Sequence, residues 1–143
     1  MRRTTPIAAT SIGKPECHST HRSPPPRLER KVRMSDATIK GYHAHVYFDE
    51  ASVEQSRAWR ERVAEEFEYS VGRFHEKNVG PHPRWSFQIA FKADDFGTIV
   101  PWLALNRKGL TVFVHGLSGD DIYDHTELVM WLGDSVALNL DAL

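Results

Sequence analysis

The sequence predicts an α+β protein of the ferredoxin-like class, in which a β-α-β-β-α-β chain builds an antiparallel sheet with helices on one face. Three observations support this prediction. Some segments alternate between apolar and polar residues like strands, others repeat apolar residues at helical spacing, and the two kinds follow one another in the ferredoxin-like order. A short C-terminal extension follows. The 143 residues are enough for one domain with a single hydrophobic core.

The first expected strand spans residues 42–48, with the sequence YHAHVYF. Successive side chains of a strand point to opposite faces. The apolar side chains should therefore face the core, while the opposite face carries His43, His45 and Tyr47. Two imidazoles on one face have two explanations. The face is solvated and tolerates histidine, or the histidines belong to a metal site.

Two helices are expected next to the strands. Residues 51–67 carry apolar side chains at helical spacing, and Ser52 with Gln55 fits a capping box at the start of this helix. Asp94 could cap the second helical region. Pro101 lies inside that region and should kink the helix or start a second piece.

Three further strands and a short helix complete the expected order. The three strands and the helix are expected, in this order, at residues 69–75, 84–92, 110–115 and 126–132. We expect Trp102 and Trp131 to lie on helix faces and to pack into the core. His75 would end the first of these strands, and because no motif surrounds it we leave it out of the site.

Charge is divided unevenly between an N-terminal tail and the rest of the chain. Residues 1–34 hold eight lysines and arginines against two glutamates, whereas residues 35–143 hold ten basic and seventeen acidic side chains. We expect residues 1–36 to form a disordered basic tail and residues 37–143 the folded domain, because the tail has too little apolar surface to offset the entropy of ordering it. Three explanations of the tail stay open: a targeting segment, a nucleic-acid-binding arm, or an extension upstream of a true start at Met34.

Composition narrows the classes of function. No apolar run approaches the roughly 20 residues of a membrane span, so we expect no membrane association. The acidic domain argues against a nucleic-acid partner. Cys17 is the only cysteine, which excludes an intramolecular disulfide and argues against a thiolate zinc site. We expect a cytoplasmic protein.

The expected topology brings histidines from distant parts of the chain together. We expect the first and third strands to be central and parallel, and the fourth to lie antiparallel beside the first, so that His115 meets His43. His82 directly precedes the third strand and His125 follows the fourth. With His45, these residues should converge at one end of the uncovered sheet face. Neutral imidazole binds iron, copper, nickel and zinc, so the convergence favours the metal site.

Other side chains near these histidines have two explanations each. Asp120, Asp121 and Asp124 could support or complete a metal site, or they form a turn in which Asp124 caps the short helix. Tyr47 shares its strand face with two histidines and is a candidate for substrate binding. Arg107 could bind a substrate carboxylate with two hydrogen bonds, or its charge could interact with the helix C-terminus.

Five motifs occur along the chain in the order YHAHVYFD, VGPHP, PWLALNR, LTVFVHGLSGDDIYDHT and WLG. Over about residues 40–135, they resemble the DOPA 4,5-dioxygenase family, which comprises the fungal enzyme of betalain pigment synthesis and bacterial relatives. The resemblance implies a ferredoxin-like fold and extradiol cleavage of a catechol by O₂ at a mononuclear non-haem Fe(II). The chain departs from the family pattern at Gly116, where proline is expected in many relatives.

The resemblance also implies roles for individual residues. His43 and His45 match the H-x-H strand of the family, His82 its GPHP loop, and His115 and His125 its fourth strand and DHT segment. Fe(II) needs open positions for substrate and O₂, so we expect three protein ligands: His45, His115 and either His43 or His125. His82 would act as acid or base, together with whichever of His43 and His125 does not bind the metal. Another divalent metal is the alternative to Fe(II).

The implied partners are O₂ and a small-molecule catechol, such as DOPA or a related dihydroxyphenyl acid. A second subunit often covers a decorated sheet face of this kind, so we expect a homodimer. The alternative function is a non-catalytic metal-binding or small-molecule-binding dimeric module. A two-histidine phosphoesterase fits less well, because its two H-x-T/S motifs are replaced by HAH and DHT.

Overall fold

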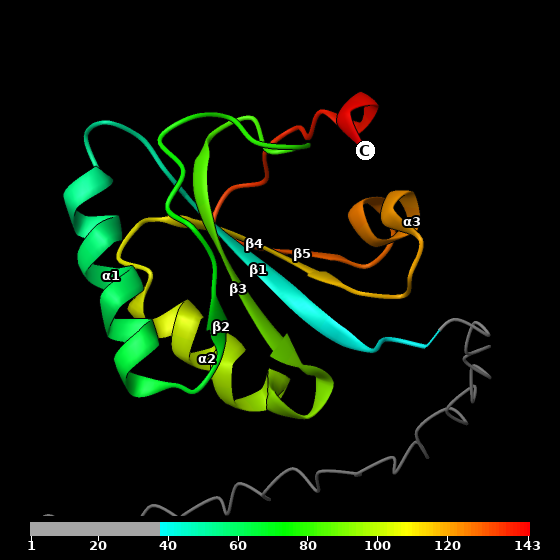
Figure 1. The fold of residues 1–143 in the computed structure, drawn as a ribbon, viewed down its shortest axis with the longest axis horizontal. Helices are drawn as coiled ribbons and strands as arrows, with labels where there is room; N and C mark the ends of the chain where they lie inside the picture. Colours follow the sequence, from blue (N-terminus) through cyan, green and yellow to red (C-terminus); the bar gives the residue numbers. More distant parts are fainter. Residues whose placement is uncertain (1–37) are drawn as a thin grey trace, which may run out of the picture. The chain divides into compact units, whose positions relative to one another are not determined.

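The computed structural model describes residues 38–143 (Figure 1), so the expected basic tail at residues 1–36 lies outside the described residues. The domain has the predicted ferredoxin-like α+β fold, extended by one strand at the edge of the sheet. None of its helices is long and apolar enough to cross a membrane. The elements are, in order, β1 (Gly41–Phe48), α1 (Val53–Glu66), β2 (Ser70–Val71), β3 (Trp85–Lys92), the 3₁₀ turn η1 (Ala93–Asp95), α2 (Phe96–Asn106), β4 (Thr111–Gly116), α3 (Asp121–Thr126), β5 (Val129–Leu132) and the 3₁₀ turn η2 (Leu140–Ala142).

The five strands form one sheet in the order β2-β3-β1-β4-β5, and each neighbouring pair is antiparallel. The prediction of parallel central strands is therefore wrong, because Gly41 of β1 pairs with Lys92 at the far end of β3. The reason lies in the connections. Helix α1 returns the chain so that β2 runs parallel to β1, and the direct link from β2 to β3 then reverses it. The predicted neighbourhood of β1 and β4 is confirmed, with His43 directly opposite His115.

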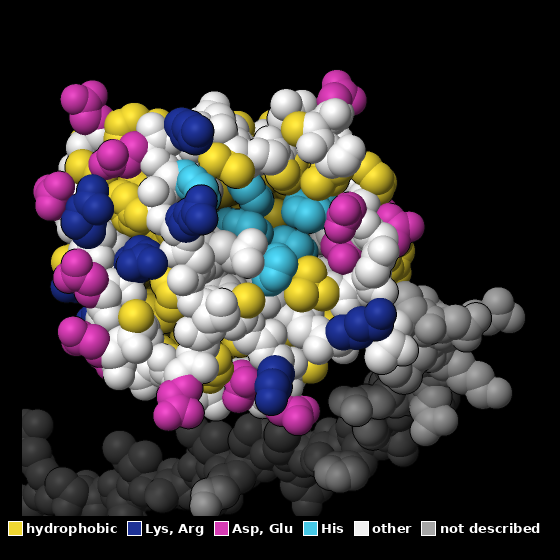
Figure 2. Space-filling view, in the orientation of Figure 1, with side chains coloured by type: hydrophobic (Ala, Val, Ile, Leu, Met, Phe, Trp, Pro, Cys, Tyr) yellow, Lys and Arg dark blue, Asp and Glu magenta, His cyan; other side chains and the backbone are white. Residues whose placement is uncertain are grey.

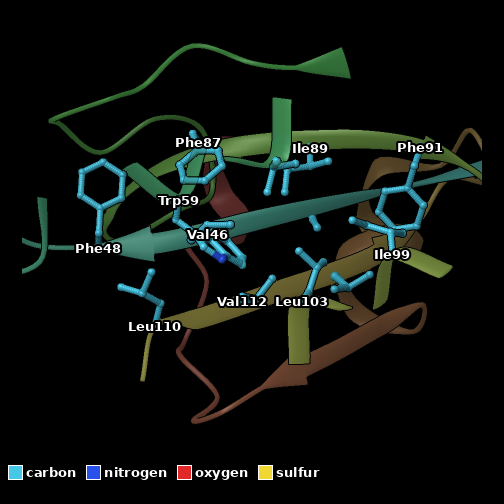
Figure 3. Close-up of a cluster of buried hydrophobic side chains, with 13 residues drawn as sticks. Val46, Phe48, Trp59, Phe87, Ile89, Phe91, Ile99, Leu103, Leu110 and Val112 are labelled. Carbon is cyan, nitrogen blue, oxygen red and sulfur yellow. The ribbon is translucent and has the colours of Figure 1, made fainter. Parts of the chain in front are cut away.

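The hydrophobic core lies on the sheet face that α1 and α2 cover (Figures 1 and 3). Strand alternation explains this placement, because every second residue of β1, β3 and β4 points to that side. Trp102 of α2 stacks on Trp59 of α1 at the margin of the core, as expected. Each fully buried aliphatic or aromatic side chain contributes about 1.5–3 kcal/mol to stability. The buried cluster comprises Ala44, Val46, Phe48, Trp59, Val63, Phe87, Ile89, Phe91, Ile99, Leu103, Leu110, Val112 and Val114.

Helix α1 begins with a different capping arrangement from the one predicted. The backbone N–H of Ser52 donates to Asp49 Oδ1 at 3.0 Å, and the backbone N–H of Asp49 donates to Ser52 Oγ at 3.0 Å. Gln55 donates to the carbonyl of Lys108 instead. The predicted capping box of Ser52 and Gln55 is therefore wrong, and a reciprocal pair forms three residues earlier. Asp94 lies within η1 rather than at the start of α2.

Two other segments differ from the prediction for local reasons. Helix α2 continues through Pro101, so the predicted second piece does not form. Proline lacks only the hydrogen bond to the carbonyl of Gly97, and both residues are exposed, so water can satisfy that carbonyl. The strand predicted at residues 69–75 shortens to β2, followed by an isolated bridge between His75 and Ser86.

The segment after β4 contradicts the predicted helix at residues 126–132. Helix α3 comes earlier, and VMWL forms β5 on the edge of β4. A short apolar run fits a strand as well as a helix. Here the strand satisfies backbone groups that the edge of β4 would otherwise leave unpaired. Trp131 consequently lies opposite Phe113 on β5, and its predicted place on a helix in the core is wrong.

Candidate metal centre

Besides His75, the sheet face opposite α1 and α2 carries five histidines, and we call it the histidine face. Strand alternation directs two side chains of β1 and one of β4 to this face, and the loop at residues 76–84 and helix α3 add one each. Figure 2 shows the histidine side chains gathered in a hollow on one side of the molecule. The structure thus brings together every histidine that the sequence singled out: His43, His45, His82, His115 and His125.

Three of these imidazoles form a group that could hold a metal ion. One ring nitrogen from each of His43, His45 and His115 lies within 4.8 Å of the other two. The Nε2 atoms of His45 and His115 are 3.2 Å apart. Two imidazoles on one ion, each at about 2.0–2.1 Å, bring their nitrogens to about 3.0–3.4 Å from each other. The His45–His115 pair therefore has the spacing of a bound pair, and His43 lies within reach of it.

A hydrogen bond holds His115 with its Nε2 atom toward His45. Its Nδ1 lies 3.1 Å from the carbonyl oxygen of Gly116, which accepts a hydrogen bond only from a protonated Nδ1. In the neutral ring, Nε2 then carries the lone pair, and this atom faces His45. Burial is the main cause that lowers the pKa of His115 to about 4, and burial with the neighbouring imidazoles lowers the pKa of His45 well below its usual value. A neutral ring whose lone pair points into the group, as in His115, suits cation binding.

His82 reaches the group by a route that the sequence did not predict. Because β3 runs antiparallel to β1, its start lies beside Phe48, at the opposite end of β1 from His43. The loop before β3 folds back over the sheet, and the ring of His82 lies 3.9 Å from that of His45 between centroids. The hydroxyl of Tyr47 lies 2.7 Å from His82 Nδ1. Both partners of this hydrogen bond are buried, with Tyr47 1% and His82 7% exposed.

His125 closes the other side of the group from α3. Its ring lies 4.1 Å from that of His115 between centroids, and its Nδ1 lies 2.7 Å from the carbonyl of Asp121. That carbonyl requires a proton on Nδ1, which leaves Nε2 of a neutral His125 as an acceptor. His125 is therefore poised beside the three-histidine group without belonging to it.

The aspartates of the loop before α3 have separate structural roles. Asp120, rather than Asp124, is the N-cap of α3, and its side chain accepts from the N–H of Tyr123 at 3.0 Å. The predicted capping by Asp124 is wrong. Asp124 is buried and accepts from the backbone N–H of Ser118 at 2.9 Å.

Arg107 is held by contacts that involve none of the histidines. Its Nη1 donates to the carbonyl of Leu110 at 3.1 Å, and its guanidinium packs against Gly133. Both contacts fix it at the C-terminal end of α2, where Arg107 is the cap residue.

Sequence reasoning missed two neighbours of the site, His75 and Trp131. His75 lines a cavity of about 170 Å³ together with His45 and His82, and the bridge to Ser86 that places it there has no sequence signature. Trp131 lies 6.0 Å from Tyr47 between ring centroids. A larger hollow of about 600 Å³ lies at another part of the sheet and contains none of the five histidines.

Comparison with known proteins gives consistent matches. Residues 42–142 match the sequence profile of the Dopa 4,5-dioxygenase family. An uncharacterized 21.2 kDa protein of Botryotinia fuckeliana is 35% identical over 125 residues, which cover 78% of this chain and 68% of that protein. A DOPA 4,5-dioxygenase of Amanita muscaria is 29% identical over 114 residues, which cover 73% of this chain but only 50% of the enzyme. A crystal structure from Nostoc punctiforme, described as that of a candidate dioxygenase, is 46% identical with a TM-score of 0.70, and the match covers 72% of this chain and 90% of that one.

Proposed function

The chain belongs to the Dopa 4,5-dioxygenase family and is by that membership a dioxygenase, and from this premise we propose that it cleaves the ring of a catechol in the extradiol manner at a mononuclear non-haem Fe(II). DOPA and related dihydroxyphenyl acids are the first substrates to test, because the Amanita relative is named for DOPA. O₂ is the second substrate. Another divalent metal remains the alternative to iron.

The observation that carries the proposal is the group of three imidazoles within 4.8 Å of one another. We assign His43, His45 and His115 as the metal ligands, a set that leaves positions open for two substrates. When bound, Fe(II) supplies those open positions and the electron transfer that extradiol oxygenation requires. The chain contributes three neutral ligands that burial keeps unprotonated near neutral pH.

His82 is proposed to donate a hydrogen bond to the substrate, and Tyr47 determines which of its nitrogens carries the proton. Burial raises the pKa of Tyr47, so its hydroxyl stays protonated and must donate. Its acceptor is His82 Nδ1 at 2.7 Å. A neutral His82 that accepts at Nδ1 carries its proton on Nε2. That N–H can donate a hydrogen bond to a substrate oxygen on which negative charge develops, so Tyr47 acts by positioning His82 rather than by contacting the substrate.

His125 is the proposed base. Its Nδ1 is held by the carbonyl of Asp121, which leaves Nε2 free to accept a proton from a catechol hydroxyl. His82 and His125 lie beside different members of the ligand group, and their ring centroids are 6.3 Å apart. The role of Arg107 toward a substrate carboxylate stays a prediction.

Iron reconstitution followed by a catechol assay tests the proposal. The protein is purified without an affinity tag, loaded anaerobically with Fe(II), and exposed to O₂ with DOPA or caffeate, and a yellow ring-cleavage product is expected. His45→Ala and His115→Ala should lose the metal, whereas His75→Ala, a histidine outside the ligand set, should retain it. Stoichiometric iron without turnover of any catechol would instead support the non-catalytic binding module. Unchanged metal content in both ligand variants would contradict the assigned site.

A homodimer also remains a proposal, and light scattering of the purified protein tests it. The cytoplasmic location stays a prediction that fractionation of cells would check.

A further inference from the structure

A small apolar cavity adjoins the histidine face on the β5 side. It measures about 200 Å³ and is lined by Phe113, His125, Val129, Trp131, Val136, Leu138 and Leu140. Six of these residues are apolar, and His125 is the one polar residue among them. The cavity has no lysine, arginine, aspartate or glutamate in its lining.

The floor of the cavity continues directly from the proposed ligands. Phe113 lies on β4 two residues before His115, and its ring centroid is 5.4 Å from that of His115 and 6.0 Å from that of His45. Trp131 packs against Phe113 at 4.5 Å between centroids. His125 belongs to both places, because it lines the cavity and lies 4.1 Å from His115. A molecule whose oxygens reach the three-histidine group therefore has this cavity as its neighbour.

The roof of the cavity is the C-terminal segment, which is tied to the loop that carries His82. The backbone N–H of Asn139 donates to the carbonyl of Pro81 at 2.9 Å. Val136 and Leu138 turn inward on the same segment. The cavity is thus formed by the β4–β5 side of the sheet and by the C-terminal segment, and both contribute apolar side chains.

We propose that this cavity binds an uncharged apolar substituent on the catechol ring, so that the protein prefers alkyl-substituted catechols to DOPA. The inference rests on the proposed function and narrows it. A volume of about 200 Å³ suffices for an alkyl chain or a six-membered ring, since a cavity of about 150 Å³ accommodates benzene. A DOPA side chain would bring an ammonium and a carboxylate to walls on which His125 is the one polar residue and no side chain is a formal ion, and burying unpaired charge is costly.

Binding to the full chain without added metal tests the cavity independently of turnover. NMR titrations with 4-methyl-, 4-ethyl- and 4-propylcatechol should give saturable shifts at the Val136 and Leu138 methyl groups and at the Trp131 indole. Each added methylene should lower Kd about fourfold, the equivalent of about 0.8 kcal/mol per buried CH₂. DOPA should bind more weakly than 4-propylcatechol. A Kd that does not change along the alkyl series, or DOPA binding as tightly as 4-propylcatechol, would overturn the proposal.

A cavity-filling variant gives the matched comparison. Val136→Phe should reduce the propyl-to-methyl ratio of affinities to about one, whereas Leu143→Phe, which changes an exposed residue outside the lining, should keep it. The iron-loaded enzyme separates this inference from the proposed function. Turnover without dependence on alkyl length would leave the dioxygenase proposal intact and refute the cavity. Binding that depends on alkyl length, without turnover, would support the cavity and contradict the dioxygenase proposal.

Discussion

The hydrogen bond between Tyr47 and His82 makes the sharpest prediction, because Tyr47→Phe removes one oxygen atom and little else. The ring keeps its packing beside Trp131, at 6.0 Å between centroids. His82 Nδ1 is left in a residue that is only 7% exposed, without its 2.7 Å donor. Leaving a buried acceptor unsatisfied costs about 1–3 kcal/mol of unfolding free energy. For a domain of about 100 residues, each kcal/mol lowers Tm by about 4–8 °C.

The same substitution should also affect catalysis, since it frees His82 to carry its proton on either nitrogen. Removing one hydrogen-bond donor to developing charge costs about 10²–10³-fold in rate, so a partial loss of about ten- to hundredfold in kcat is expected, with little change in KM. Urea denaturation, steady-state kinetics and ¹⁵N NMR of the His82 ring are the assays.

Tyr42→Phe is the control, because Tyr42 lies on the same strand but packs against Phe91 on the core side, and its hydroxyl makes no side-chain hydrogen bond within residues 38–143. If Tyr47→Phe matched this control in stability and left the proton of His82 on Nε2, the positioning role would be refuted.

Three further predictions concern stability. Leu103→Ala should lower the unfolding free energy by about 2–5 kcal/mol in urea titrations, because Leu103 is fully buried in the core. Gly133→Ala should destabilise by about 1 kcal/mol or more, since Gly133 has φ 91° and an added Cβ would lie 2.7 Å from Arg107 Nη1. Metal-free protein should lose stability between pH 6.5 and about 4. Unfolded His82 and His115 take up protons near 6.5, but burial holds the pKa of both near 4 in the fold, so the unfolded chain binds more protons and unfolding free energy falls by up to about 3 kcal/mol per histidine.

Each of these predictions has a contrasting measurement. Leu105→Ala, at an 85% exposed position on the same helix as Leu103, should change stability by less than about 0.5 kcal/mol. Gly97→Ala should stabilise by about 0.4–1 kcal/mol, since Gly97 lies in α2 with open space around its Cα. If both glycine variants lost stability, the explanation from the positive φ and the close contact at Gly133 would be refuted. Stability that did not decrease toward pH 4 would show that these histidines are protonated in the fold.

Local periodicity was enough to predict which face each central residue occupies. Val46 and His45 are neighbours in β1. Alternation alone places Val46 in the core and His45 on the histidine face. The pairing of His43 with His115 also followed from the order of elements. The direction of β3 depends on how often the chain reverses between β1 and β3. Because β3 was predicted to be parallel to β1, His82 was placed near His43 for a wrong reason. The loop at residues 76–84 nevertheless brings His82 to the three-histidine group, although β3 is antiparallel to β1.

Where the sequence misled, tertiary contacts decided between two local structures. VMWL is short enough to form either a strand or a helix, and the free edge of β4 selected the strand. This choice turned Trp131 from an expected core residue into a wall of the apolar cavity. His75 shows the same limit, because its position beside His45 depends on a single bridge to Ser86. Neither the bridge nor the cavity has a periodic signature in the chain.

Asp124 shows how the two kinds of information combine at the site. Its spacing in the sequence suited an N-cap, yet the structure gives that position to Asp120 and buries Asp124, which is 2% exposed. Its carboxylate accepts from Ser118 and thereby closes the loop before α3, which sets His125 over His115. Its charge also raises the pKa of His43 and His115, against the larger opposing influence of burial. It is the one buried carboxylate within residues 38–143, and a buried negative charge beside imidazoles favours a cation in the group. The loop sequence therefore places His125 and also brings a buried negative charge near the group, which would compensate the charge of a metal held there.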